Sequence, residues 1–285
     1  MTSSRLAPGA GIVTVPGGRP AVRTAEGEFL HLDTGTADLA ALTRRLVAGE
    51  AAPDTASDDE VARVAAAFER EGHAVRPAPD EGGPLTGRTV LLLGDARLTG
   101  PLARYAAAEG ARTRRTTPDH VARLADGDGA DASTAVVWCL DEPVPPGLWD
   151  AADRLPAHGT AWLRCHREGA HLWTEPLAAA PGDVTSAHVR LRRLAATSAH
   201  RQLAAYWAGH RTPDNGPHPG EAAAALVAAL LTADLLAWAT PGPNSRLPAR
   251  RRLRRVDLRD LTVTEHPVLP VPPVAPLPGR GSGPA

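Results

Sequence analysis

The stretch 88–111 carries the clearest chemical pattern and reads RTVLLLGDARLTGPLARYAAAEGA. An apolar strand, a glycine-bearing turn and a helix form the arrangement that holds nucleotide phosphates on backbone amides and on the helix N-terminus. A phosphate-binding turn of this type needs the pattern GxGxxG, but this one has only Gly94 and Gly100, and Asp95 follows Gly94 directly. The Asp95 carboxylate would lie where a phosphate must bind. The sequence therefore predicts neither a nucleotide nor another cofactor here.

The thiols and imidazoles offer little further chemistry. Cys139 and Cys165 are the two cysteines, and each lies on a predicted buried strand with no activating base beside it. Two cysteines are too few for a four-thiolate zinc site or a disulfide scaffold, which favours a reducing, cytoplasmic location. The eleven histidines have no HxxxH spacing on a helix. We therefore predict no catalytic residue and no metal ligand.

Composition restricts the fold and the partners. With 285 residues, 43% of them hydrophobic, the chain is long enough for two domains. A net charge of -1, from 31 basic and 32 acidic residues, argues against nucleic acid or an anionic membrane as the partner. The most apolar segment, 221–239, contains Glu221 and Asp234 and is rich in alanine, which favours a buried helix or a homodimer interface over a membrane span.

Residues 88–270 alternate between predicted strands and helices. TVLLLGDA predicts a strand buried on both faces, and the residues that follow predict a helix ending at Gly110. Further along, STAVVWCLDEP predicts another strand, PPGLWDAADRLPAHG a helix, and TAWLRCHREGAHLWTEPL two strands. Between them ARTRRTTPD shows no clear strand ending in an acidic residue. The fold class is therefore α/β, with a degenerate Rossmann-like domain.

Residues 1–77 have a separate pattern. Three short strands are predicted at 11–15, 21–24 and 28–32, separated by turn residues. Two helices follow, one with Leu39, Leu42 and Leu46 at helical spacing, the other capped by Ser57 or Asp58 and closed by Gly72. This order predicts a winged-helix module of three strands and three helices, joined to the second domain by a proline- and glycine-rich linker at 78–87.

A winged helix can bind nucleic acid or a peptide. The last helix of the module carries more acidic than basic residues, which disfavours phosphate contact. Peptide capture needs an open strand edge beside a helix, and strand 28–32 with helix 58–71 supplies both. The predicted contacts are Glu28, Phe29, Leu30, His31 and Leu32 of the strand with Arg63, Ala67 and Arg70 of the helix. In the alternative interpretation, Phe29, Leu32, Val61, Val64 and Phe68 only form the core.

Two further segments carry a family resemblance. EPLAAAPGDVTSAHVRLRRLA at 175–195 resembles the GPL…PG…PCxxC…R segment of ThiF-like (ubiquitin-activating-enzyme-like) partners of YcaO cyclodehydratases. RRLRRVDLRDLTVTEHPVLPVPPVAP at 251–276 is similar to their closing D…T…HPxCPxC. Residues 1–77 likewise resemble the PqqD-like recognition element that precedes the ThiF-like domain in these proteins. The resemblance covers most of the chain, in the family's order.

The sequence also departs from this family. The paired zinc cysteines would fall at 184–189 and 269–274, where the chain has none, and no set of adenylation residues can be placed. The resemblance then implies a non-catalytic protein that binds the leader of a ribosomal precursor peptide. A separate YcaO cyclodehydratase would form the azolines, and the proline-rich tail 271–285 could contact that enzyme. The alternatives are a nucleotide-dependent enzyme with a nonstandard phosphate loop and a winged-helix DNA-binding regulator.

Overall fold

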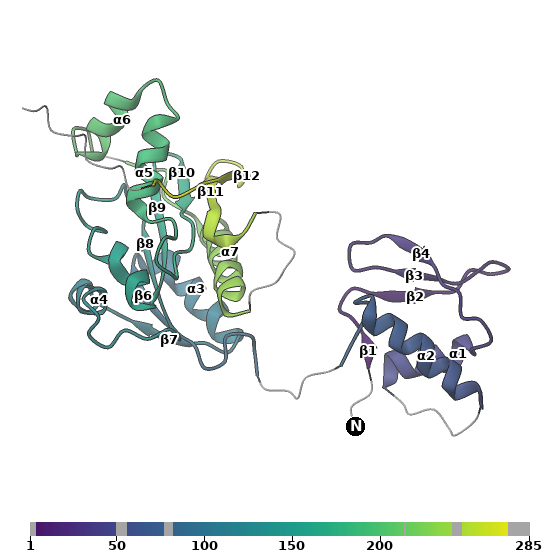
Figure 1. Ribbon diagram of the computed structural model, residues 1–285. Coiled ribbons are helices and arrows are strands. Elements are labelled where there is room, and N and C mark those ends of the chain that lie inside the picture. Colours follow the sequence, from purple (N-terminus) through teal and green to yellow (C-terminus); the bar gives the residue numbers. More distant parts are fainter. Residues whose placement is uncertain (1–3, 50–55, 77–81, 214, 241–246, 273–285) are drawn as a thin grey trace, which may run out of the picture. The chain divides into compact units, whose positions relative to one another are not determined.

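The chain consists of two structural units. The computed structural model describes residues 4–49, 56–76, 82–213, 215–240 and 247–272. The chain divides into Met1–Glu81 and Gly82–Ala285 (Figure 1), and each unit has a hydrophobic core of its own. The division falls inside the segment 78–87 predicted as a linker, of which 78–81 lie outside the described residues.

The first unit packs a small sheet against two helices. Its elements are β1 (Arg5–Leu6), β2 (Gly11–Val13), β3 (Ala21–Arg23), β4 (Phe29–His31), α1 (Leu39–Ala48), α2 (Ala56–Arg70) and β5 (Ala74–Val75). Strands β2, β3 and β4 form an antiparallel sheet in that order, and β1 pairs with β5. The Asp38 side chain caps α1 by accepting from the N–H groups of Ala40 and Ala41, and Gly49 ends the helix with φ 73°. The core contains Leu42, Leu46, Val61 and Phe68, all at most 4% exposed.

Most of the elements predicted for this unit are present. The three strands lie within the predicted ranges, and Leu42 and Leu46 face the core as their spacing indicates. Helix α2 begins at Ala56, one residue before the predicted caps, Ser57 or Asp58. The prediction of three helices is wrong for the described part of the unit, which has two. The short β1–β5 pair, too brief to produce a sequence pattern, was not predicted.

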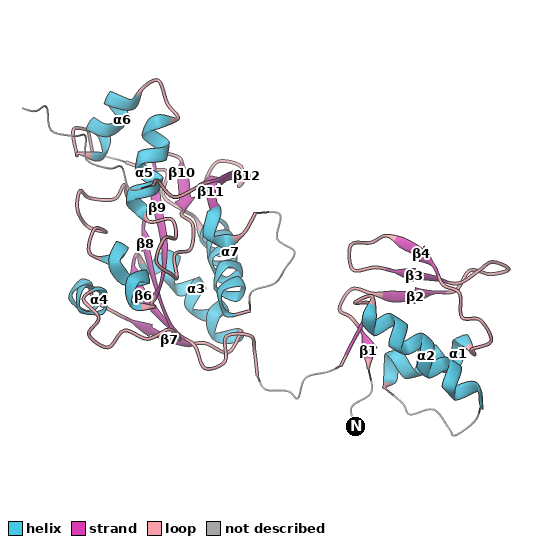
Figure 2. Cartoon of the chain, in the orientation of Figure 1, coloured by secondary structure: helices cyan, strands magenta, loops and turns pink. Residues whose placement is uncertain are grey.

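The second unit is a mixed α/β domain (Figure 2). Its sheet has the order β12-β11-β10-β9-β8-β6-β7; β7, β6, β8 and β9 run parallel, and β10, β11 and β12 extend it antiparallel. The strands are β6 (Thr89–Gly94), β7 (Arg112–Arg115), β8 (Thr134–Leu140), β9 (Ala161–Glu168), β10 (His171–Thr174), β11 (Arg252–Asp257) and β12 (Val263–Pro267). The helices are α3 (Ala96–Ala108), α4 (Pro118–Ala125), α5 (Ser186–Ala195), α6 (His200–Trp207) and α7 (Glu221–Ala239), with 3₁₀ helices η1 (Ala152–His158) and η2 (Ala249–Arg251).

Both faces of β8, a central parallel strand, are buried. Successive residues of β8 alternate between two core clusters, with Val137 on the side of α3 and α7 and Val136 on the side that contains residues of α4 and η1. Strand β8 is buried along its whole length, as its continuous apolar run predicts. The strand order changes direction between β6 and β8, which is where open parallel sheets usually bind ligands.

Three predictions for this unit need correction. Residues 82–87 are not a free linker, because Leu85 is fully buried and its N–H donates to the Glu109 carbonyl at 2.8 Å. The segment 145–159, predicted as a helix, contains only the 3₁₀ helix η1 (Ala152–His158), in which Pro156 removes a backbone donor. The segment 111–119, predicted to have no clear strand, contains β7, an edge strand with mostly exposed side chains.

Helix α7 packs within the second unit. It is long and apolar enough to cross a membrane, but half of its most apolar window is buried against the rest of the unit. Asp234, in the middle of α7, is 1% exposed and accepts from Arg254 at 2.6 Å and from Arg252 at 2.9 Å. The ion pairs compensate the burial of the carboxylate and tie α7 to β11.

A mostly buried carboxylate joins β9 to α5 and α6. Glu168 accepts from Arg193 through both carboxylate oxygens, at 3.1 and 2.6 Å, and from Trp207 Nε1 at 2.7 Å. His166 Nε2 lies 3.2 Å from the same carboxylate. Burial by itself would raise the pKa of Glu168, but the contacts with His166 and Arg193 lower it well below its usual range. Glu168 is therefore an ionised anchor for this corner of the unit.

Candidate functional site

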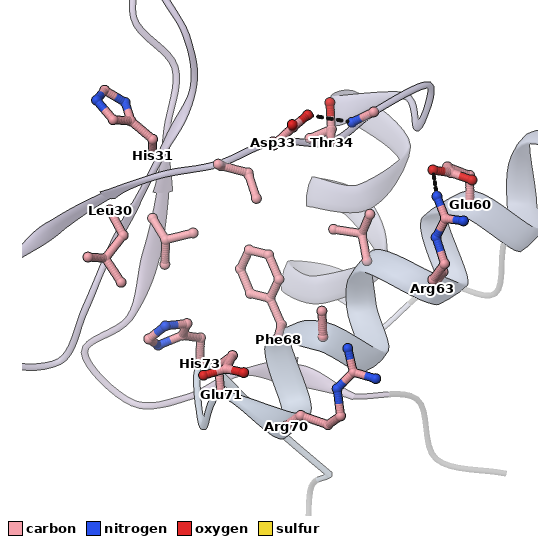
Figure 3. Close-up of a pocket in the computed structure, with 15 residues that line it drawn as sticks. Leu30, His31, Asp33, Thr34, Glu60, Arg63, Phe68, Arg70, Glu71 and His73 are labelled. Carbon is pink, nitrogen blue, oxygen red and sulfur yellow. Dashed lines mark hydrogen bonds and ion pairs between the residues drawn. The ribbon is translucent and has the colours of Figure 1, made fainter.

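A groove of about 570 Å³ lies between β4 and α2 in the first unit (Figure 3). Its floor is apolar and consists of Val22, Leu30, Leu32, Val64, Ala67 and Phe68. Its rim is polar and consists of His31, Asp33, Thr34, Gly35, Glu60, Arg63, Arg70, Glu71 and His73. An apolar floor with a polar rim is typical of a site that holds an organic ligand or a peptide segment.

Helix α2 faces the groove with residues three or four positions apart. Ala67 lies between Arg63 and Arg70, about one helical turn from each, and its short side chain leaves space in the middle of the helix face. Arg63 forms an ion pair with Glu60, whereas Arg70 is exposed and forms no ion pair with another described residue. Arg70 can therefore contact a bound group without first breaking an internal pair.

The loop after β4 closes one end of the groove. Asp33 accepts from the Gly35 N–H at 2.9 Å, which is an Asx turn, and Gly35 has φ 56°. A Cβ at Gly35 would lie 3.0 Å from Glu60 Oε1, so the turn runs directly over the beginning of α2. The sequence DTG directly after a strand was the signal that could have added these residues to the predicted site.

The open edge of β4 offers backbone hydrogen bonds beside the groove. Thr24 N–H donates to the Glu28 carbonyl at 2.8 Å, and Leu32 N–H donates to the Pro20 carbonyl at 2.9 Å. Bonded and non-bonded pairs alternate in an antiparallel ladder, so Leu30 also bonds toward β3. The N–H and C=O groups of Phe29 and His31 consequently point away from the sheet, along the groove side of β4. An added strand would bond there.

Most of the predicted contact residues meet in this groove. Leu30, His31, Leu32, Arg63, Ala67 and Arg70 all line it. Glu28 and Phe29 do not: Glu28 closes the β3–β4 hairpin, and Phe29 is 64% exposed. The interpretation as core residues holds for Leu32, Val61 and Phe68, which are at most 9% exposed, and is wrong for Phe29.

The glycine turn of the second unit is filled by protein groups. Asp95 is the N-cap of α3, and its carboxylate accepts from the Arg97 N–H at 2.7 Å. A Cβ at Gly94 would lie 1.8 Å from the Cys139 carbonyl oxygen, so β6 and β8 approach each other closely beside the turn. The helix N-terminus, which would attract a phosphate, already holds an anionic side chain.

The two thiols lie side by side on neighbouring strands. Cys139 and Cys165 are directly paired between β8 and β9, and both are fully buried. A hydrogen bond with Cys139 and burial raise the pKa of the Cys165 thiol. A nucleophile must be a thiolate and must be accessible, and Cys165 is neither. Among the described residues, no three His, Cys, Asp or Glu side chains are placed to hold a metal ion.

The segment 184–189 and the residue just before 269–274, the two places where the resembling family would carry its zinc cysteines, meet through apolar side chains. Val184, Val189, Val268 and Leu253 form a small core cluster, and each is at most 6% exposed. Arg192 reinforces the contact by donating to the carbonyls at positions 269 and 270, at 3.1 and 2.9 Å. These residues do not fit a zinc site, because none of the four cluster side chains can ligate a metal.

Metal removal should therefore leave the second unit intact. We expect an excess of EDTA to leave the thermal unfolding temperature unchanged, because apolar packing replaces the metal. Val184→Ala should lower the free energy of unfolding by about 2 kcal/mol, the usual cost of a cavity of this size. Calorimetry of both proteins with and without EDTA tests this expectation, and a lower unfolding temperature of the unmutated chain in EDTA would contradict it.

Comparison with known proteins shows a similarity of fold. No protein-family model and no curated protein sequence matches the chain. A solved heterocyclase, TruD, superposes with a TM-score of 0.65 at 12% identity, over 95% of this chain and 42% of that one. A heterocyclase in complex with substrate and cofactor gives 0.63 at 10% identity, over 95% and 39%. Escherichia coli MccB with ATP gives 0.55 at 10% identity, over 94% and 97%.

The chain has the fold of these proteins. It spans about two fifths of the two heterocyclase chains and nearly all of MccB. The mixed α/β architecture is thus that of heterocyclases and of MccB. At 10–12% sequence identity, this similarity shows a shared fold and carries no information about the residues of the groove.

Proposed function

We propose that the chain binds the leader segment of a ribosomal precursor peptide and presents it to a separate YcaO-type cyclodehydratase for azoline formation. The groove between β4 and α2 is the observation that supports this proposal. It combines an open strand edge, an apolar floor and an exposed guanidinium, which together suit an extended peptide. The strands and helices of the first unit would then act as a winged-helix, PqqD-like recognition element.

The fold of the whole chain supports the assignment to this pathway. The heterocyclases that the chain resembles contain a region of this fold within a much longer chain. As part of the same proposal, we infer that the protein acts in the cytoplasm, in complex with the cyclodehydratase.

Non-catalytic action is part of the proposal. The capping of α3 by Asp95 and the burial of both thiols support it, because each removes a group on which a reaction would depend. Apart from Glu221 at its start, the exposed residues of α7 are Ala222, Ala229, Ala233 and Ala237, which are apolar and would suit contact with a second copy in a homodimer.

Two alternatives make different predictions. A nucleotide-dependent enzyme with a nonstandard phosphate loop would be stabilised by ATP, which would raise its unfolding temperature. A winged-helix regulator would bind duplex DNA with an affinity that falls steeply with salt. Glu60, Glu69 and Glu71 on and beside α2 speak against the second alternative.

Filling the groove should weaken peptide binding. Ala67→Trp places an indole between β4 and α2, and we expect it to weaken binding of the cognate leader at least about 10-fold, because the apolar floor is no longer accessible. Ala66→Trp is the matched control: Ala66 is the exposed neighbour on α2 and does not line the groove, so its affinity should stay within about 2-fold. Titration calorimetry with synthetic leader measures both. Equal affinities of the two variants would contradict the assignment of the groove.

A further inference from the structure

The Phe29 ring is highly exposed and lies outside the groove. Among the described residues it is the large apolar side chain with the greatest exposed fraction, 64%, and it does not line the cavity beside it. Single exposed apolar residues are common on protein surfaces. Phe29, however, lies on the same strand edge where the proposed peptide would add, so its position relative to that peptide can be derived from the ladder.

The two faces of β4 are distinct. Leu30 pairs with Val22, which is 4% exposed, and both side chains lie on the α2 side of the sheet. Side chains alternate along a strand, so those of Phe29 and His31 lie on the opposite face. Figure 3 shows the His31 ring directed away from Phe68 and the groove floor.

The row of side chains that contains Phe29 ends at the open edge. Across the sheet, Phe29 pairs with Arg23, and Arg23 pairs with Gly11. Arg23 bends away to bond the Gly9 carbonyl at 3.0 Å, and Gly11 has no side chain. The Phe29 ring therefore has a cross-strand neighbour only on the side of β4 that pairs with β3. On the open side of β4, the neighbouring position would be filled by a side chain of an added strand.

A peptide added to β4 must alternate in the same way. Its residue opposite Leu30 points into the groove, and the residue opposite Phe29, next to it in the peptide, points to the other face. We propose that the bound segment is recognised on both faces, through two consecutive large apolar residues, one seated on the groove floor and the next packed against Phe29. This inference rests on the proposed function and specifies the chemistry of the peptide that the site accepts.

Aromatic and aliphatic side chains directly opposite each other on adjacent strands stabilise the pairing. A polar peptide residue opposite Phe29 would instead contact an apolar ring. On that face of β4, His31 is the only described side chain that could form a hydrogen bond with it. Selectivity for an apolar pair thus follows from the register of the strand and needs no additional pocket.

The full-length chain can be tested with displayed random peptides of about ten residues, a length that spans the edge. The unmutated chain should enrich peptides with two adjacent large apolar residues. Phe29→Ala should keep the preference at one of the two positions and lose it at the other. The best peptide should bind Phe29→Ala about 5-fold more weakly, with most of the affinity restored in Phe29→Leu. Val47→Ala, 59% exposed on α1, is the control and should leave the affinity unchanged.

The outcomes separate this inference from the function on which it rests. If the Phe29→Ala selection returns the same motif at the same affinity, the peptide is read from the groove alone and the inference is wrong, while the proposed function stands. If the unmutated chain enriches no peptide, the proposed function fails and the inference fails with it. Unfolding temperatures of the variants show whether a loss of binding reflects a loss of fold.

Discussion

His31→Pro should strongly weaken leader binding and leave the protein folded. The N–H of His31 points to the open edge, so proline at this position removes no bond between β3 and β4. It does remove one of the two donors that an added strand would use, and its ring occupies the space where that strand must approach. We expect at least about a 30-fold loss of affinity, which exceeds the contribution of a single hydrogen bond because the register is disrupted.

Two companion variants isolate the backbone effect. His31→Ala keeps the N–H and should bind within about 3-fold of the unmutated chain, since the imidazole of this rim residue points away from the groove floor. Leu30→Pro removes a donor that bonds toward β3 and should lower the unfolding temperature of the first unit, whereas His31→Pro should not. Titration calorimetry and thermal unfolding measure these effects. Equal binding by His31→Pro and His31→Ala would mean that β4 is not the pairing edge.

Glu168→Gln should destabilise the second unit by about 3 kcal/mol, within the usual range for breaking a buried ion pair. The neutral amide has one acceptor oxygen, so it can accept only one of the two bonds from Arg193, and Arg193 is left without its bidentate anionic partner between Trp173 and Trp207. Helices α5 and α6 would lose their main polar link to β9. Denaturant unfolding of the variant and of the unmutated chain measures the difference.

The pH dependence gives this prediction a second readout. Folding lowers the pKa of Glu168. Its contribution to the free energy of unfolding is therefore complete at a pH above the pKa of the unfolded chain, about 4.3, and is lost progressively as the pH falls below that value. The gap in unfolding free energy between the two proteins should therefore narrow from pH 6 toward pH 3. The control is Asp126→Asn, which breaks the exposed pair with Arg154 and should cost less than about 1 kcal/mol. A gap independent of pH would show that Glu168 is not an ionised anchor.

The sequence was sufficient where a local pattern determines the structure. The strands at 11–15, 21–24 and 28–32 are found because each short β-prone run is bounded by glycine or proline turns. The groove followed from chain order alone, since an edge strand and an amphipathic helix have few ways to pack. The turn at Gly94 could be interpreted from the sequence because a phosphate-binding turn requires the pattern GxGxxG, and the Asp95 carboxylate after Gly94 breaks that pattern.

The sequence was insufficient where long-range contacts decide. Strand β7 reads RTRR and has no apolar alternation, because it lies at the sheet edge and takes its conformation from pairing with β6. Arg254 is charged, and nothing in its local sequence indicates that it is buried with Asp234, its ion-pair partner twenty positions away. The exposed side of Phe29 could not be derived either, since the face on which it lies depends on the register of β4 against β3.

The most direct test of the central claim is amide hydrogen exchange of the full-length chain with and without its leader peptide. We predict that binding slows exchange at the N–H groups of Phe29 and His31, which point outward from β4, and leaves the Leu30 N–H, already bonded toward β3, nearly unchanged. A leader that binds tightly while the exchange of Phe29 and His31 stays as fast as in the free chain would contradict strand addition at β4.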